Sequence, residues 1–210
     1  MPVYLNELEI GTATDLIGFP HVLLCMGVVA MTGNALYGLH VDVTTPATRD
    51  GAYRALHGFM QARQAGPIVA LYGSCNHTKR YPDAVNRVAA WQAEMTVLAG
   101  ILGNWHGPAR GFSTAFIEPR DGTYIEYQPD FANGACQIHY KRHEKMQAPD
   151  RVQHSPTSGF NPDITKYHPG RDALVPVYLE VVSADVKPTW SNKGQLHELD
   201  YANRLLEFAV

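Results

Sequence analysis

Cys25 and His40 are the residues of this chain whose types and spacing point most directly to chemistry. Cys25 ends the apolar run Val22-Leu23-Leu24, and His40 ends the next run, fifteen positions later. Gly33-Asn34 lies between them as a turn signal, so the two runs have the pattern of a hairpin. Side chains that are near neighbours across a hairpin come within hydrogen-bond reach, and a thiol beside an imidazole becomes a nucleophile at neutral pH. We therefore predict a Cys25–His40 pair.

Two strands and a helix are the elements that must position this pair. Residues 22–31 form an apolar run typical of a buried strand, Thr32-Gly33-Asn34 is the turn, and residues 35–43 are the second strand. Thr45 followed by Pro46 has the composition of a helix N-terminus, and apolar residues recur after it at helical spacing. Both members of the pair are therefore expected near the same end of the hairpin.

The rest of the chain alternates strands, helices and loops. We predict a central strand over 67–72 with a tight loop at 73–76, a helix over 83–102, a hairpin of 112–118 and 123–128 around Asp121-Gly122, a strand over 135–141, a long surface loop over 144–170, an apolar strand over 173–182 and an amphipathic segment over 196–208. These elements predict one catalytic domain over 1–210, with its core at about 20–130 and a further strand and helix within 171–208.

Composition narrows the class of protein. With 210 residues, 45% of them hydrophobic, the chain is expected to fold as one globular unit. The formal charge of −3 gives no basic field, so nucleic acid is not an expected partner. Three cysteines without close spacing fit a reducing compartment. No signal peptide and no apolar stretch of about 18 residues is seen, which predicts a soluble protein without a membrane partner, either cytoplasmic or exported without a cleaved signal.

The order of these elements resembles a known superfamily. A Cys-bearing strand, a hairpin, a His-bearing strand, a helix from Thr45, a strand to Gly73, a long helix and Gly107-Pro108-Ala109-Arg110 follow one another as in the CheD-type chemoreceptor glutamine deamidases. The same arrangement of Cys and His looks like the catalytic domain of the cytotoxic necrotizing factors. Both convert glutamine side chains of proteins to glutamate. The resemblance implies an α/β sandwich with a central mixed, largely antiparallel β-sheet flanked by two main helices.

The resemblance also implies roles for single residues. Cys25 would be the nucleophile and His40 the general base and acid, with the Met26 or Cys25 amide stabilising the oxyanion. CheD-type proteins orient the histidine with a threonine shortly before the cysteine, but residues 18–24 contain none. Asp42 or a backbone carbonyl is then expected to orient His40. The implied reaction uses no cofactor and no metal, its partner is a protein substrate, and the protein would act as a bacterial effector or toxin.

Two other functions stay open. Cys75, in Gly73-Ser74-Cys75-Asn76, follows a predicted central strand, and with His106 as base it would make a cysteine peptidase, amidase or acyltransferase. A non-catalytic binding or immunity-type protein on a deamidase-like scaffold is the third hypothesis. The Leu23-Leu24 pair before Cys25 agrees with it, because the superfamily usually has glycine there.

Cys136, His139 and His143 have spacings that would suit metal ligands on a helix. The segment alternates as a strand does and runs into Lys141-Arg142, so we interpret it as a strand end. Neither a P-loop nor a dinucleotide-binding fingerprint is present, and no nucleotide cofactor is expected.

Overall fold

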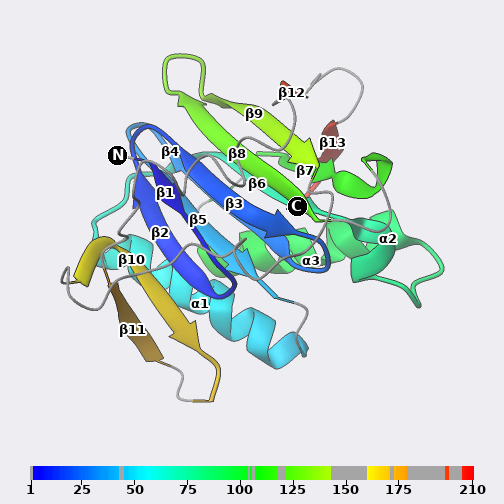
Figure 1. The fold of residues 1–210 in the computed structure, drawn as a ribbon, viewed down its shortest axis with the longest axis horizontal. Coiled ribbons are helices and arrows are strands. Elements are labelled where there is room, and N and C mark those ends of the chain that lie inside the picture. Colours follow the sequence, from blue (N-terminus) through cyan, green and yellow to red (C-terminus); the bar gives the residue numbers. More distant parts are fainter. Residues whose placement is uncertain are drawn as a thin grey trace.

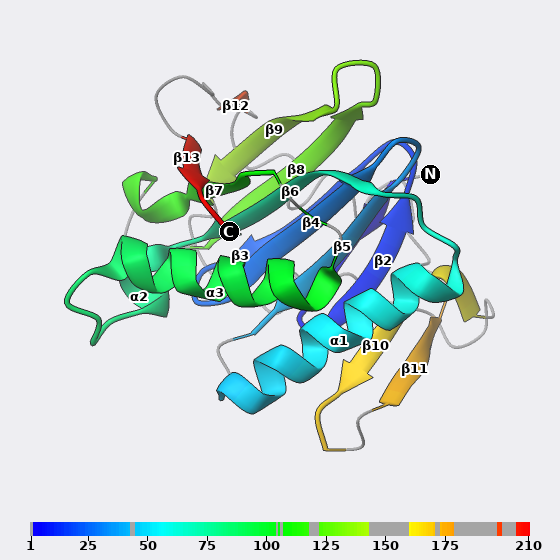
Figure 2. The same cartoon turned by 180° about the vertical axis from the view of Figure 1, so that it is seen from behind.

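The protein consists of two packed β-sheets with two long helices on the outer face of the larger sheet (Figures 1 and 2). The structure, a computed structural model, describes residues 2–42, 45–103, 105, 107–117, 122–142, 160–170, 173–178, 197–198 and 205–210. The α/β sandwich with a mixed, largely antiparallel sheet and two main helices is confirmed. Both helices cover the same face of that sheet, and the second sheet covers the other face.

The larger sheet has the strand order β11-β10-β2-β5-β4-β6-β7-β13 among the described residues. Its neighbours are antiparallel except for the parallel pair of β6 and β7. The strands are β2 (Glu9–Ala13), β4 (Met26–Thr32), β5 (Leu36–Val41), β6 (Ile68–Cys75), β7 (Ala109–Ser113), β10 (Phe160–His168), β11 (Ala173–Tyr178) and β13 (Leu205–Phe208).

The smaller sheet has the order β1-β3-β8-β9-β12 among the described residues. Strands β1 and β3 are parallel and the other neighbours are antiparallel. The strands are β1 (Val3–Tyr4), β3 (Ile17–Val22), β8 (Thr123–Asp130), β9 (Ala135–Arg142) and β12 (His197–Glu198).

Side-chain caps set the ends of the helices. Helix α1 (Pro46–Ala62) begins after Thr45, whose hydroxyl accepts a hydrogen bond from the Thr48 amide, as the Thr-Pro pattern predicts. Helix α3 (Arg87–Leu102) begins a little later than predicted, because the Asn86 side chain caps it. The short helices α2 (His77–Arg80) and η1 (Thr114–Phe116) complete the described helical segments.

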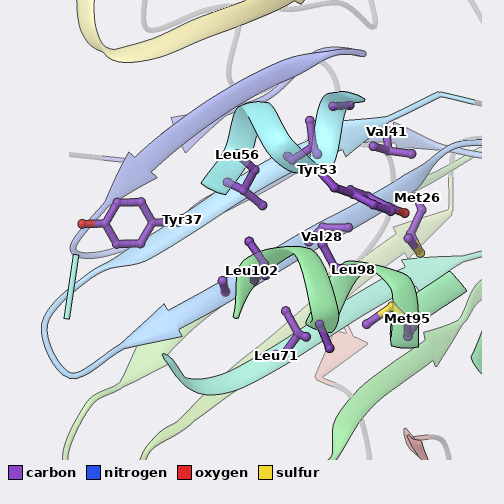
Figure 3. Close-up of a cluster of buried hydrophobic side chains, with 14 of the residues drawn as sticks. Met26, Val28, Tyr37, Val41, Tyr53, Leu56, Leu71, Met95, Leu98 and Leu102 are labelled. Carbon is purple, nitrogen blue, oxygen red and sulfur yellow. The ribbon is translucent and has the colours of Figure 1, made fainter. Parts of the chain in front are cut away.

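Strand β4 is buried on both faces, which explains its continuous apolar sequence. Met26, Val28 and Ala30 pack toward the helices, whereas Val29 and Met31 pack between the two sheets. The core under the helices, seen in Figure 3, also includes Tyr37, Val41, Tyr53, Leu56, Leu71, Met95, Leu98 and Leu102. The core between the sheets includes Ile17, Phe19, Leu36, Tyr72, Phe112, Ile125, Tyr127 and Ile138.

The predicted hairpin around Asp121-Gly122 is wrong. Strand β7 lies in the larger sheet between β6 and β13, and β8 lies in the smaller sheet between β3 and β9. The Asp-Gly signal is local, whereas the buried Ile125 and Tyr127 of β8 pack with the core between the sheets. Residues 118–121 lie outside the described residues.

Two predictions for the C-terminal third also need correction. Residues 160–168 of the predicted 144–170 loop form β10, because this segment pairs with β2 while Ile164 is buried between the sheets and Tyr167 under the helices. Within the predicted strand and helix of 171–208, the described residues form only strands, and Leu205–Phe208 pairs with β7. Pairing with distant strands determines these segments, and local periodicity does not reveal it.

Gly27 provides a test of the packing between the sheets. A Cβ atom at Gly27 would lie 2.7 Å from the Phe19 ring, so Gly27→Ala should lower the free energy of unfolding by about 1–3 kcal/mol. Gly58→Ala is the matched control: it lies in α1 with no atom near its Cβ position and should stabilise by up to about 1 kcal/mol. Urea unfolding measures both, and equal effects of the two variants would contradict this packing.

Candidate active site

Cys25 lies in a bend between two strands. The predicted strand over 22–31 is interrupted: Val22 ends β3 in the smaller sheet, Leu23-Leu24-Cys25 form the bend, and Met26 begins β4 in the larger sheet. The chain crosses between the sheets at this bend. Leu24 is 45% exposed, whereas Cys25 is 2% exposed. The thiol is thus at the end of the core between the sheets, one residue from the surface.

His40 lies on β5 directly opposite Gly27 of β4. Because Gly27 has no side chain, the imidazole is adjacent to the Phe19 ring, with ring centroids 5.5 Å apart. The Nε2 atom of His40 lies 2.8 Å from the Sγ atom of Cys25. The structure therefore brings the two predicted residues together through the hairpin of β4 and β5.

The backbone carbonyl of Leu5 holds the other ring nitrogen of His40. The Nδ1–O distance is 2.8 Å, and since a carbonyl only accepts, Nδ1 carries a hydrogen and donates it. The Leu5 amide donates to the Gly18 carbonyl, and the Leu8 amide donates to the His40 carbonyl. These bonds fix the segment that crosses from β1 to β2 over the imidazole. Nε2 is therefore the ring nitrogen that contacts the Cys25 sulfur.

The surroundings of His40 favour its charged form. Burial lowers the pKa of the imidazole, but this effect is outweighed by the negative charge on Cys25, the hydrogen bond to its sulfur, the bond to the Leu5 carbonyl and the charge of Glu7. Together they raise the pKa of His40 to about 9. The protonated form of His40 is thus favoured at neutral pH, and its Nε2 atom faces the Cys25 sulfur, which also lies 3.3 Å from the His21 carbonyl oxygen.

Met26 and Asp42 flank this pair. Met26 pairs with Val41 on one side and Cys75 on the other, and its side chain lies in the core under the helices. Asp42 follows the end of β5 and is half-buried. Either Asp42 or a backbone carbonyl was expected to orient His40. The contact with Nδ1 is made by a backbone carbonyl, that of Leu5.

A buried ion pair of Arg80 and Glu94 contacts the bend through the Leu24 carbonyl. Arg80 donates to Glu94 through Nη2 at 2.7 Å and to the Leu24 carbonyl through Nη1 at 3.0 Å. Glu94 also accepts hydrogen bonds from the hydroxyls of Tyr53 and Tyr81. Sequence reasoning missed this group. The available signal was Glu94 itself, a charged residue on the core-facing stripe of its helix.

Cys75 is the last residue of β6 and not part of a loop, contrary to the prediction. It is fully buried under the helices, and burial raises the pKa of its thiol well above the usual value. Its predicted partner, His106, lies outside the described residues. The position of Cys75 therefore favours a structural thiol.

Cys136 and His139 lie on β9, which confirms the predicted strand. Cys136 is buried, with its sulfur 3.7 Å from the Met31 sulfur, and the His139 ring is 3.8 Å from a Glu126 oxygen. His143 lies outside the described residues. Within the described part of the chain, no three His, Cys, Asp or Glu residues are grouped as metal ligands.

Comparisons with family models, curated proteins and solved structures found no match to this chain. Among the described helices, none combines the length and apolar character that crossing a membrane requires. The functional argument therefore depends on the geometry of the site.

The charge state of His40 is directly measurable. In the wild type, NMR of the labelled imidazole should show a protonated ring at pH 7.5 that loses its proton near pH 9. In Cys25→Ser the hydroxyl keeps a hydrogen-bonding partner but brings no negative charge. Burial then dominates and the pKa should fall to 6.5 or below. A ring that is neutral at pH 7.5 in the wild type would contradict the raised pKa of His40.

Proposed function

We propose that the protein is a cysteine-dependent hydrolase that converts glutamine side chains of a protein substrate to glutamate. The observation that carries this proposal is the continuous set of contacts from the Leu5 carbonyl through His40 to the Cys25 sulfur. A nucleophile, a base within hydrogen-bond reach and a third group that orients the base define nucleophilic catalysis of acyl transfer.

The chemistry follows from this arrangement. The Cys25 sulfur attacks the carboxamide carbon, and the carbonyl oxygen becomes an oxyanion. His40 donates its Nε2 proton to the amide nitrogen, the C–N bond breaks, and ammonia leaves a thioester. His40 then takes a proton from water, which attacks the thioester and releases glutamate and the thiol. Water is the only co-reactant, so the proposal involves no cofactor.

The Cys25 and Met26 amides are the proposed donors to the oxyanion. Met26 lies on β4, which pairs with β5 on one side and with β6 on the other. The N–H groups of such a strand lie in the plane of the sheet and point toward the neighbouring strands. Cys25 precedes the strand and lies in the bend. The Cys25 amide is therefore the better placed of the two.

The choice of a protein glutamine as substrate comes from the resemblance to the CheD-type deamidases and the cytotoxic necrotizing factors. The structure agrees with what that resemblance implies in its mixed sheet, its two helices and its Cys and His on adjacent segments. On the same basis we propose that the protein acts as a bacterial effector or toxin.

One observation favours a second function. Cys25 and His40 are 2% and 1% exposed, so a substrate side chain has almost no access to the sulfur in this conformation. A non-catalytic binding or immunity-type protein on this scaffold would show the same burial. Reactivity of the folded protein separates the two functions.

Deamidation is tested by incubating the protein with a cell lysate and mapping glutamine-to-glutamate conversion by mass spectrometry. The wild type should convert a discrete set of glutamines, and Cys25→Ser should convert none. His40→Gln should slow the reaction at least about 100-fold, because it removes the base.

Cys75→Ala is the matched control, since it removes a buried thiol without touching the Cys25–His40 contact. It should retain conversion, with some loss of stability. Conversion that survives in Cys25→Ser and disappears in Cys75→Ala would overturn the assignment. No conversion by a wild type whose Cys25 is also unreactive would favour the binding protein.

A further inference from the structure

The ion pair of Arg80 and Glu94 reaches the bend that carries the nucleophile. Arg80 uses two of its nitrogens on Glu94, Nη2 at 2.7 Å and Nε at 3.3 Å, and the third, Nη1, on the Leu24 carbonyl at 3.0 Å. The side chains of Arg80 and Glu94 are each 4% exposed. One guanidinium thus connects helix α3 to the peptide immediately before Cys25.

The energetics of such a pair argue for a role beyond stability. A buried ion pair loses the hydration of both charges, and apolar side chains of the same volume often give equal or greater stability. Here the pair is extended by the hydroxyls of Tyr53 and Tyr81 on Glu94, and the Arg49 guanidinium lies 3.8 Å from the same carboxylate. These partners hold Glu94, and through it Arg80, in one geometry.

The contact with Leu24 has a consequence for Cys25. The carbonyl and the N–H of a planar trans peptide point in opposite directions. With the Leu24 carbonyl held by Arg80, the Cys25 N–H of the same peptide is directed away from the ion pair. The orientation of this amide is therefore fixed by a residue that does not contact the Cys25–His40 pair itself.

We propose that Arg80 is a positioning residue that, anchored by Glu94, orients the Leu24–Cys25 peptide so that the Cys25 amide stabilises the oxyanion. This inference rests on the proposed function, because it assigns a role within acyl transfer to Cys25. It adds a requirement that the Cys-His pair alone does not contain. Activation of the thiol depends on His40, whereas stabilisation of the oxyanion depends on Arg80.

Two reagents that react with the Cys25 sulfur distinguish activation of the thiol from stabilisation of the oxyanion. Iodoacetamide alkylates Cys25 by displacing iodide, and no oxyanion forms. In acylation by p-nitrophenyl acetate, the sulfur attacks the carbonyl carbon, an oxyanion forms, and the C–O bond breaks to release p-nitrophenolate and leave an acetyl thioester. The ratio of the two rates, mapped to Cys25 by mass spectrometry, thus reports oxyanion stabilisation without knowledge of the natural substrate.

The variants preserve charge balance in the core. Arg80→Lys keeps the cation but cannot bond both carboxylate oxygens and the Leu24 carbonyl with the same planar geometry. Arg80→Met combined with Glu94→Gln removes both charges together and leaves an acceptor for the two tyrosines, so no unpaired charge is buried. Tyr81→Phe is the matched control, because it removes a hydrogen bond from Glu94 and leaves the contact between Arg80 and Leu24 in place.

Both Arg80 variants should lower the ratio of acylation to alkylation at least tenfold, and up to about 100-fold if the donor is lost completely. The alkylation rate and the His40 NMR titration should stay close to those of the wild type, and Tyr81→Phe should keep the wild-type ratio. If Cys25 of the wild type is reactive, but the acylation and alkylation rates fall together or do not change in the Arg80 variants, the positioning role of Arg80 is overturned and the proposed function is not. A wild-type Cys25 that reacts with neither reagent overturns the proposed function and this inference with it.

Discussion

The contact between the His40 imidazole and the Cys25 sulfur is the interaction on which the rest of the site depends. It places the His40 imidazole, whose pKa is raised to about 9, 2.8 Å from the sulfur in a region with almost no exposure to water. A charged imidazole is unfavourable in such a place unless opposite charge and hydrogen bonds compensate for lost hydration. The sulfur and the Leu5 carbonyl provide that compensation, one at each ring nitrogen.

The architecture provides the space that this pair needs. The chain crosses between the two sheets twice near the site, once at the segment after β1 that supplies Leu5 and once at the bend that supplies Cys25. Gly27 leaves room between them for the imidazole and for Phe19, which packs against it. The sandwich of two sheets therefore defines where Cys25, His40 and the Leu5 carbonyl meet.

Much of this could be predicted from the sequence where local signals are strong. The turn at Gly33-Asn34, the Thr45 cap and the apolar spacing of α3 reveal a hairpin and two helices, and the hairpin places Cys25 near His40. The Leu5 carbonyl could not be predicted, because a backbone group has no residue type that marks it. The roles of Asn34 and Thr45 are local, whereas Leu5 meets His40 across 35 positions of the chain.

The pairing of distant strands escaped prediction for the same reason. Among residues 162–168 of β10, Ile164 and Tyr167 are buried and their neighbours are exposed or half-buried. Strand β8 joins a sheet whose existence no local pattern indicates. The contacts of Arg80 with Glu94 and with the Leu24 carbonyl likewise join residues that are 14 and 56 positions apart. Contacts of this kind become visible only when the chain is folded.

The pH dependence of Cys25 alkylation, compared between the wild type and His40→Ala, tests the central claim most directly. A sulfur in contact with an imidazolium should react with iodoacetamide well below pH 8.5, the usual pKa of a free thiol, and His40→Ala should remove that reactivity. Cys75, which is buried and has a raised pKa, serves as the internal reference and should react only when the protein unfolds. A Cys25 that stays protected until unfolding, or reacts equally with and without His40, would contradict the account.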